Sequence, residues 1–132
     1  MEKIYFGHPV NFYDTPKECD LIDAILKVWP NSFIENPNQV RHQVGYKEYK
    51  ERTGNGMAYF SQEVLPKMDR GVFLPFEDGM FGAGVFKEAM KLAELGKPIH
   101  QIKLDGKISK MYISELHRML SVEETRKRVY GR

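Results

Sequence analysis

The chain has 132 residues, of which 42% are hydrophobic and 29% charged, a balance typical of a globular domain and unlike that of disordered, collagen-like or membrane-spanning chains. Its formal net charge is only +2, so composition gives no support to a nucleic-acid-binding role. The lone Cys19 cannot form an internal disulfide, and no apolar run has the length of a signal peptide or a membrane span. We therefore expect one cytoplasmic domain over residues 1–132, with neither a membrane nor a nucleic-acid partner.

The chain begins with a predicted strand and helix. Residues 3–6 form a short apolar run that predicts a buried strand, and Gly7 ends it. Thr15 and Glu18 fit a capping box at the start of a helix. Apolar side chains recur at helical spacing until Pro30, so one face of this helix should pack on a sheet.

A second strand is predicted at residues 32–35, closed by a turn. Residues 39–54 are the most polar part of the chain, and we expect a mobile excursion there. A helix that Pro66 could kink is expected next, because a set of apolar side chains shares one helical face: Met57, Phe60, Val64, Leu65 and Met68.

The clearest strand is predicted at residues 71–76, because an unbroken apolar run is typical of a strand covered on both faces of a parallel sheet. A loop over residues 77–84 leads into a helix that stops at Gly96. Two further strands are predicted at residues 99–104 and 110–113.

A carboxy-terminal helix is expected from about Ser114, broken near Ser121, where a second capping box begins. Strands that alternate with helices predict an α/β fold, with a mainly parallel five-stranded sheet between helices on both faces. In such sheets, ligands bind outside the carboxyl ends of the strands. That rule indicates the loop after Tyr5 and the loop between Phe76 and Val85.

Several residues near these loops could carry chemistry. Gly82 and Gly84 would let a ligand approach backbone N–H groups at a helix start, or they simply meet the needs of a tight turn. Glu88 stands early in that helix, where the dipole favours an ionised and nucleophilic carboxylate; the alternative is a solvated acid that complements the dipole. Tyr5 could hold such a carboxylate, or only pack. Glu63 could bind a base or sugar, or face water.

Neither a metal ion nor a cofactor is expected. The histidines lack metal-ligand spacing, and no catalytic motif surrounds Cys19. The basic run at residues 126–128 could contact phosphate, but we interpret it as a solvated helix end.

Two stretches resemble signatures of the nucleoside 2-deoxyribosyltransferase family. In residues 3–9 a strand tyrosine precedes a Gly-x-Pro loop, as in that family's opening. Residues 71–74, an acidic loop and residues 84–88, with Gly-Lys-Pro beginning eight residues beyond the Glu, resemble the second signature. The pattern is also similar to that of the 2'-deoxynucleoside 5'-phosphate N-hydrolases, and more distantly to that of lysine-decarboxylase-like phosphoribohydrolases. It implies a flavodoxin-like or Rossmann-like three-layer sandwich.

The resemblance also implies an activity. Glu88 would attack the anomeric carbon of a small-molecule nucleoside or nucleotide, and Tyr5 would orient the carboxylate. Gly7, Gly82 and Gly84 would lie beside the substrate. If water accepts the glycosyl group the result is hydrolysis, and if a second base accepts it the result is transfer.

Two departures from the family pattern keep alternatives open. The transferases have an Asp six residues before the nucleophile, where this chain has Gly82. Asp78 or Glu77 could reach the base instead, and Glu63 loosely matches the family's helix carboxylate. A homo-oligomer could complete each site with Tyr130 of a neighbour. The alternatives are a nucleotide-binding or sensing module without catalysis, and a structural or interaction domain.

Overall fold

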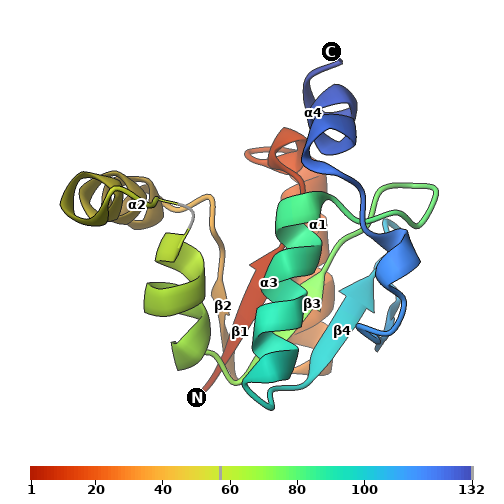
Figure 1. The fold of residues 1–132 in the computed structure, drawn as a ribbon. Coiled ribbons are helices and arrows are strands. Elements are labelled where there is room, and N and C mark those ends of the chain that lie inside the picture. Colours follow the sequence, from red (N-terminus) through yellow and green to blue (C-terminus); the bar gives the residue numbers. More distant parts are fainter. Residues whose placement is uncertain (57, 132) are drawn as a thin grey trace.

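A mixed, mostly parallel sheet forms the centre of the molecule. The computed structural model describes residues 1–56 and 58–131, which Figure 1 shows. The five strands follow the order β2-β1-β3-β4-β5, and the first four of the chain pair in parallel. They are β1 (Glu2–Gly7), β2 (Ser32–Glu35), β3 (Arg70–Phe73), β4 (Ile99–Ile102) and β5 (Ile108–Lys110). The predicted α/β class and mainly parallel sheet are confirmed.

The last strand differs from the sequence prediction in position, and it is the antiparallel strand of the sheet. A strand was expected at residues 110–113, but β5 ends at Lys110 and pairs antiparallel with β4. The chain reverses within a few residues at Gly106, whose φ is +87°. A parallel pair needs a crossover of about a dozen residues or more, so a connection this short permits only a hairpin.

Helices cover both faces of the sheet, which gives three layers (Figure 1). Because alternate residues of a strand face opposite sides, Ile4 and Phe6 pack against α1 (Pro16–Val28), while Tyr5 packs on the other face. That second face is covered by α3 (Ala83–Glu94) and by the short helical segments before β3. The strand alternation therefore separates two hydrophobic cores, and Tyr5 belongs to the α3 side.

The polar stretch at residues 39–54 is a helix, α2 (Val40–Thr53), so the predicted excursion is wrong. Its contacts are unusual, which is why apolar spacing did not reveal it. The helix packs through the buried side chain of His42 and through Gly45, whose missing side chain leaves room for the Tyr59 hydroxyl. In Figure 1, α2 stands beside the sheet rather than on it.

The helix expected before the central strand is irregular. A π-helical segment, η2 (Phe60–Val64), passes directly into a 3₁₀ segment, η3 (Leu65–Lys67), which contains Pro66. Its apolar face packs on the sheet as predicted, except that Met57 lies outside the described residues.

Three short helical elements complete the chain: η1 (Val10–Phe12), η4 (Leu116–Arg118) and α4 (Val122–Tyr130). The predicted capping box is present at Ser121, so α4 begins there and not at Ser114. In the described part of the chain, no helix combines the length and the apolar character needed to cross a membrane.

The close contact between β3 and α3 gives a test of the packing. A Cβ atom on the buried Gly71 would come within 2.5 Å of both Leu92 and the Phe73 ring. Overpacking of this kind costs about 1–3 kcal/mol, so we expect Gly71→Ala to lower the free energy of unfolding in urea by about that much. Gly84→Ala is the matched control, because a side chain there meets open space in an exposed part of α3. A Gly71→Ala protein as stable as the control would contradict this packing.

Candidate functional site

The first strand and the third helix bring Tyr5 and Glu88 together. The Tyr5 hydroxyl donates a hydrogen bond to Glu88 Oε2 at 2.5 Å, although the two residues are 83 positions apart in the chain. Tyr5 is fully buried, with its ring near those of Phe60 and Phe73. Burial raises the pKa of Tyr5 well above its usual value, and the Glu88 charge adds to that rise. The phenol is therefore a fixed hydrogen-bond donor to the carboxyl group.

The charge state of Glu88 differs from the expectation based on the helix dipole. Glu88 lies in the second turn of α3, where the field of the helix end has largely faded. Loss of hydration raises the pKa of Glu88 to about 7, and only the Tyr5 hydrogen bond opposes this shift. The residue itself keeps partial exposure, so its dry carboxyl group lies within reach of the surface.

Gly7 makes room for this carboxyl group at the end of β1. A Cβ atom at Gly7 would lie 2.6 Å from the Phe73 ring and 3.3 Å from Glu88 Oε1. A side chain at Gly7 would therefore collide with its neighbours. The sequence suggested that Gly7 lies beside a substrate, whereas the groups that need the space are Phe73 and Glu88.

A buried pair fixes the loop that follows β1. His8 Nδ1 donates to the Phe6 carbonyl at 2.9 Å, and His8 Nε2 lies 2.7 Å from Glu18 Oε2 in α1. Because a carbonyl oxygen only accepts hydrogen bonds, Nδ1 must carry a proton. The short contact between Nε2 and the Glu18 carboxyl group needs a second proton, which lies between the ring and the carboxyl group. Glu18 thus completes only half of the predicted capping box: its backbone N–H bonds Thr15, while its carboxyl turns to His8.

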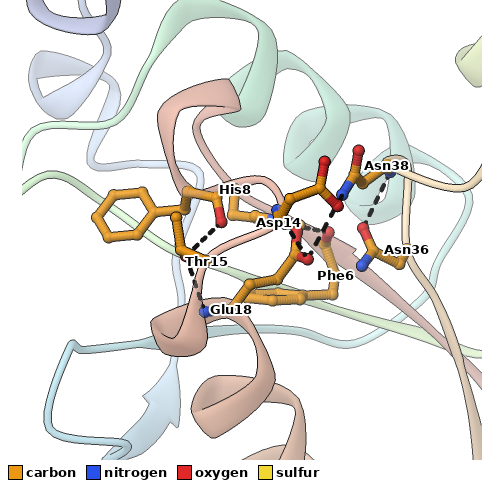
Figure 2. A network of polar contacts seen from close by, with 8 residues as sticks. Phe6, His8, Asp14, Thr15, Glu18, Asn36 and Asn38 are labelled. Carbon is orange, nitrogen blue, oxygen red and sulfur yellow. Dashed lines mark hydrogen bonds and ion pairs between the residues drawn. The ribbon is translucent and has the colours of Figure 1, made fainter.

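The same network holds a strained turn (Figure 2). Asp14 has a φ of +60°, which is rare for a non-glycine residue. Asn38 donates to Asp14 Oδ1 at 2.9 Å, and the Asp14 N–H donates to Glu18 Oε1 at 3.3 Å. This turn sets the direction of the neighbouring residue, Tyr13.

Tyr13 is a site residue that the sequence did not reveal. It is half-buried, its ring lies 5.0 Å from that of His8, and burial together with the charge of Glu88 raises its pKa. The Tyr130 phenol is also close enough to contribute to that shift. No local motif marks Tyr13, because its position depends on the Asp14 turn and on the His8–Glu18 pair.

The start of α3 is occupied by a residue of α4. The Ala83 N–H donates to Thr125 Oγ1 at 2.9 Å, and a Cβ atom on Gly82 would lie 3.2 Å from the Thr125 methyl group. Gly84 is exposed with open space beside it. The sequence predicted that backbone N–H groups at the start of this helix bind a ligand, but the Ala83 N–H is already bonded to Thr125.

The α4 helix positions two further predicted site residues, because its Arg128 pairs with Asp78 and its last residue is Tyr130. Asp78 Oδ2 lies 2.8 Å from Arg128, whose guanidinium stacks over the Phe76 ring. The hydrogen bond from Arg128 lowers the pKa of Asp78. The basic run is thus not merely a solvated helix end, since Arg128 ties α4 to the loop after β3. Tyr130, 63% exposed at the end of α4, lies near Tyr13 of its own chain.

Glu63 lies in a different place from the other predicted site residues. Its carboxylate is 3.6 Å from Arg52 of α2, and it lines a groove between α2 and η2. That groove also contains Glu35 and His42, neither of which the sequence singled out. Their importance depends on how α2 packs, which apolar periodicity did not predict.

Within residues 1–56 and 58–131, no group of three His, Cys, Asp or Glu side chains converges so as to hold a metal ion. Comparison with family models, with curated proteins and with solved structures gives no match for this chain. The interpretation of the site therefore rests on its geometry.

The raised pKa of Glu88 predicts a pH-dependent cost of burial. The native state holds this proton more tightly than the unfolded chain, so the stabilisation is complete at low pH and is lost as pH rises through about 7. At about 1.4 kcal/mol per pKa unit, the ionised carboxylate costs up to about 3 kcal/mol. We expect Glu88→Gln to exceed the wild type in urea stability by up to that amount at about pH 8.5, and by little at about pH 5.

Glu123→Gln is the control, because the Glu123 side chain is 84% exposed on α4. It should change stability little at either pH. A difference between Glu88→Gln and wild type that does not grow with pH would contradict the burial argument.

Proposed function

We propose that this protein cleaves or transfers the N-glycosidic bond of a nucleoside or nucleotide, with Glu88 as the nucleophile. The observation that carries the proposal is the 2.5 Å hydrogen bond from the buried Tyr5 phenol to the Glu88 carboxyl group. A carboxylate that is dry, forms no ion pair with any described residue, and is oriented by a fixed donor has the properties of a nucleophile.

The reaction would take two steps. In the first, an ionised Glu88 oxygen forms a bond to the anomeric carbon, and the bond from that carbon to the base nitrogen breaks. The base leaves with the electron pair and takes a proton from solvent. In the second, water attacks the same carbon and releases Glu88, while its proton goes to solvent. A second base in place of water gives transfer. Tyr5 holds one carboxylate oxygen, which leaves the other free to attack.

Residues around the pair support substrate binding. Tyr13 remains protonated beside Glu88, so it can donate a hydrogen bond to the sugar or base. Asp78 lines clefts at the carboxyl edge of the sheet, although neither Tyr5 nor Glu88 is among their described lining residues, and Gly84 leaves open space at the start of α3. Gly7 leaves room for the Glu88 carboxyl group and Gly82 for Thr125, so both shape the site from within the chain. Glu63 lies in the other groove, which weakens its assignment to the base.

The wider setting agrees with this proposal. Strand order 2-1-3-4-5 is that of flavodoxin-like sheets, although their last strand is parallel. The resemblance to nucleoside 2-deoxyribosyltransferases rests on the same Tyr5 and Glu88. We propose a cytoplasmic enzyme that needs no cofactor, and a homo-oligomer in which the exposed Tyr130 also contacts a neighbour.

A second candidate function is nucleotide binding without catalysis. It is favoured by the surroundings of Gly82, where the nearest described side chains are Thr125 and the Phe76 ring rather than a carboxylate that could serve the departing base. Such a module would bind a nucleotide at the same sheet edge and leave its glycosidic bond intact.

Release of free base tests both functions. The protein is incubated with ribo- and deoxyribonucleosides and their 5'-monophosphates, and free base is measured by chromatography. We expect Glu88→Ala to lower turnover at least about a thousandfold. Tyr5→Phe should lower it about ten- to a hundredfold, since one hydrogen bond to a charged group is lost. The exposed variant Glu123→Ala should retain activity. A ligand-induced rise in Tm without base release would support the binding module instead.

The pH dependence of turnover gives a separate test. Because attack requires ionised Glu88, kcat/KM should rise with pH and level off above about 7. The Tyr5 hydrogen bond lowers the pKa of Glu88, so Tyr5→Phe should move the midpoint upward. A midpoint near that of an ordinary carboxyl group, or one that Tyr5→Phe leaves in place, would contradict the assigned nucleophile.

A further inference from the structure

A second possible binding site lies away from Glu88, in the groove between α2 and η2. Its volume is about 600 Å³, within the range of small-molecule sites. The groove runs beside the β1 and β2 edge, and neither Tyr5 nor Glu88 is among its described lining residues.

A buried carboxylate, Glu35, lies at the carboxyl end of β2 and lines this groove. It is only 4% exposed, and Arg41 and His42 both donate to the same oxygen, Oε1, at 2.5 and 2.6 Å. Among the described residues, nothing donates a hydrogen bond to Oε2. Since no fully buried side-chain oxygen in the described chain lacks a partner, Oε2 keeps some contact with solvent, and this groove is a cavity that Glu35 lines. Oε2 is a preformed acceptor.

The charge around Glu35 selects the kind of donor. Arg41 already balances the carboxylate, and His42 is held from its other side by the Tyr59 hydroxyl at 3.0 Å. An additional full positive charge would gain little beside Arg41. A neutral N–H or O–H group, by contrast, satisfies Oε2 without adding charge.

The rest of the groove favours an anion. Two of the three acids on the lining, Glu35 and Glu63, are paired with arginines, which leaves Glu48 as the one acid there without an ion pair to a described residue. The lining also carries two lysines, Lys3 and Lys67, that form no ion pair with any described residue, so its unpaired charges are positive in sum. Two ammonium groups without an ion pair, beside a carboxylate oxygen that can accept from a neutral donor, indicate a ligand with an anionic end and a neutral donor end.

We propose that this groove binds a small organic anion that also carries a neutral N–H or O–H donor, with Glu35 Oε2 accepting from the donor and Lys3 and Lys67 facing the anionic group. The site does not depend on the glycosidic chemistry proposed for Glu88, so either can fail alone.

Amide chemical shifts in ¹H–¹⁵N spectra test the site directly. Orotate and AMP carry both an anionic group and neutral N–H donors, uracil carries donors alone, and benzoate carries an anion alone. We expect orotate and AMP to shift the amides of Gly45 and Lys67, and uracil and benzoate to bind at least about tenfold more weakly. No shift with orotate or AMP at millimolar concentration would overturn the proposal.

Variants assign the contacts. Glu35→Gln keeps an acceptor for Arg41 and His42 but places an N–H₂ group in the groove, so orotate should bind at least about tenfold more weakly. Lys67→Ala, at an exposed position, should weaken orotate without affecting uracil. Glu88→Gln should leave the shifts at Gly45 unchanged. Equal orotate affinity in wild type and in both groove variants would overturn the assignment, as would loss of these shifts in Glu88→Gln.

Discussion

The hydrogen bond from Tyr5 to Glu88 joins the first strand to the third helix, and the candidate site depends on it. Two opposing effects meet at this contact. Loss of hydration favours the protonated carboxyl group, whereas the phenol favours the ionised form. Their balance leaves the pKa of Glu88 at about 7, so the group can be charged near neutral pH at a cost in stability. The raised pKa of Glu88 follows from its loss of hydration, and no described side chain forms an ion pair with this carboxyl group.

Strand alternation made this convergence predictable. Ile4 and Phe6 must face one core, which sends Tyr5 to the other face, and the parallel order places the start of α3 at the same edge as the end of β1. The apolar run in β3 and the glycine at the end of α3 were also readable, because they depend on local periodicity and local conformation. What the pattern could not supply was the depth of Glu88, since burial depends on Phe73 and Gly7.

Contacts made by polar side chains between distant segments were not predictable. The α2 helix packs through His42 and Gly45, so it lacks the apolar stripe by which helices are recognised. Docking of α4 rests on the Thr125 bond to Ala83 and on the ion pair between Arg128 and Asp78. Such contacts leave no periodic trace, because a single hydrogen bond fixes each of them. The position of Tyr13 was hidden for the same reason.

Two carboxyl groups on the α3 side of the sheet, those of Glu35 and Glu88, are removed from water but have different hydrogen-bond partners. Tyr5 and Glu35 are neighbours across the β1 and β2 pair, so the phenol lies between Glu35 and Glu88 and feels both charges. Glu35 bonds Arg41 and His42 through one oxygen, which leaves the other oxygen as an acceptor. Glu88 has only the neutral phenol, so it exchanges a proton near neutral pH. The two proposed roles follow this difference, because a carboxylate paired with Arg41 and His42 suits ligand binding, whereas one without a cation, such as Glu88, suits nucleophilic attack.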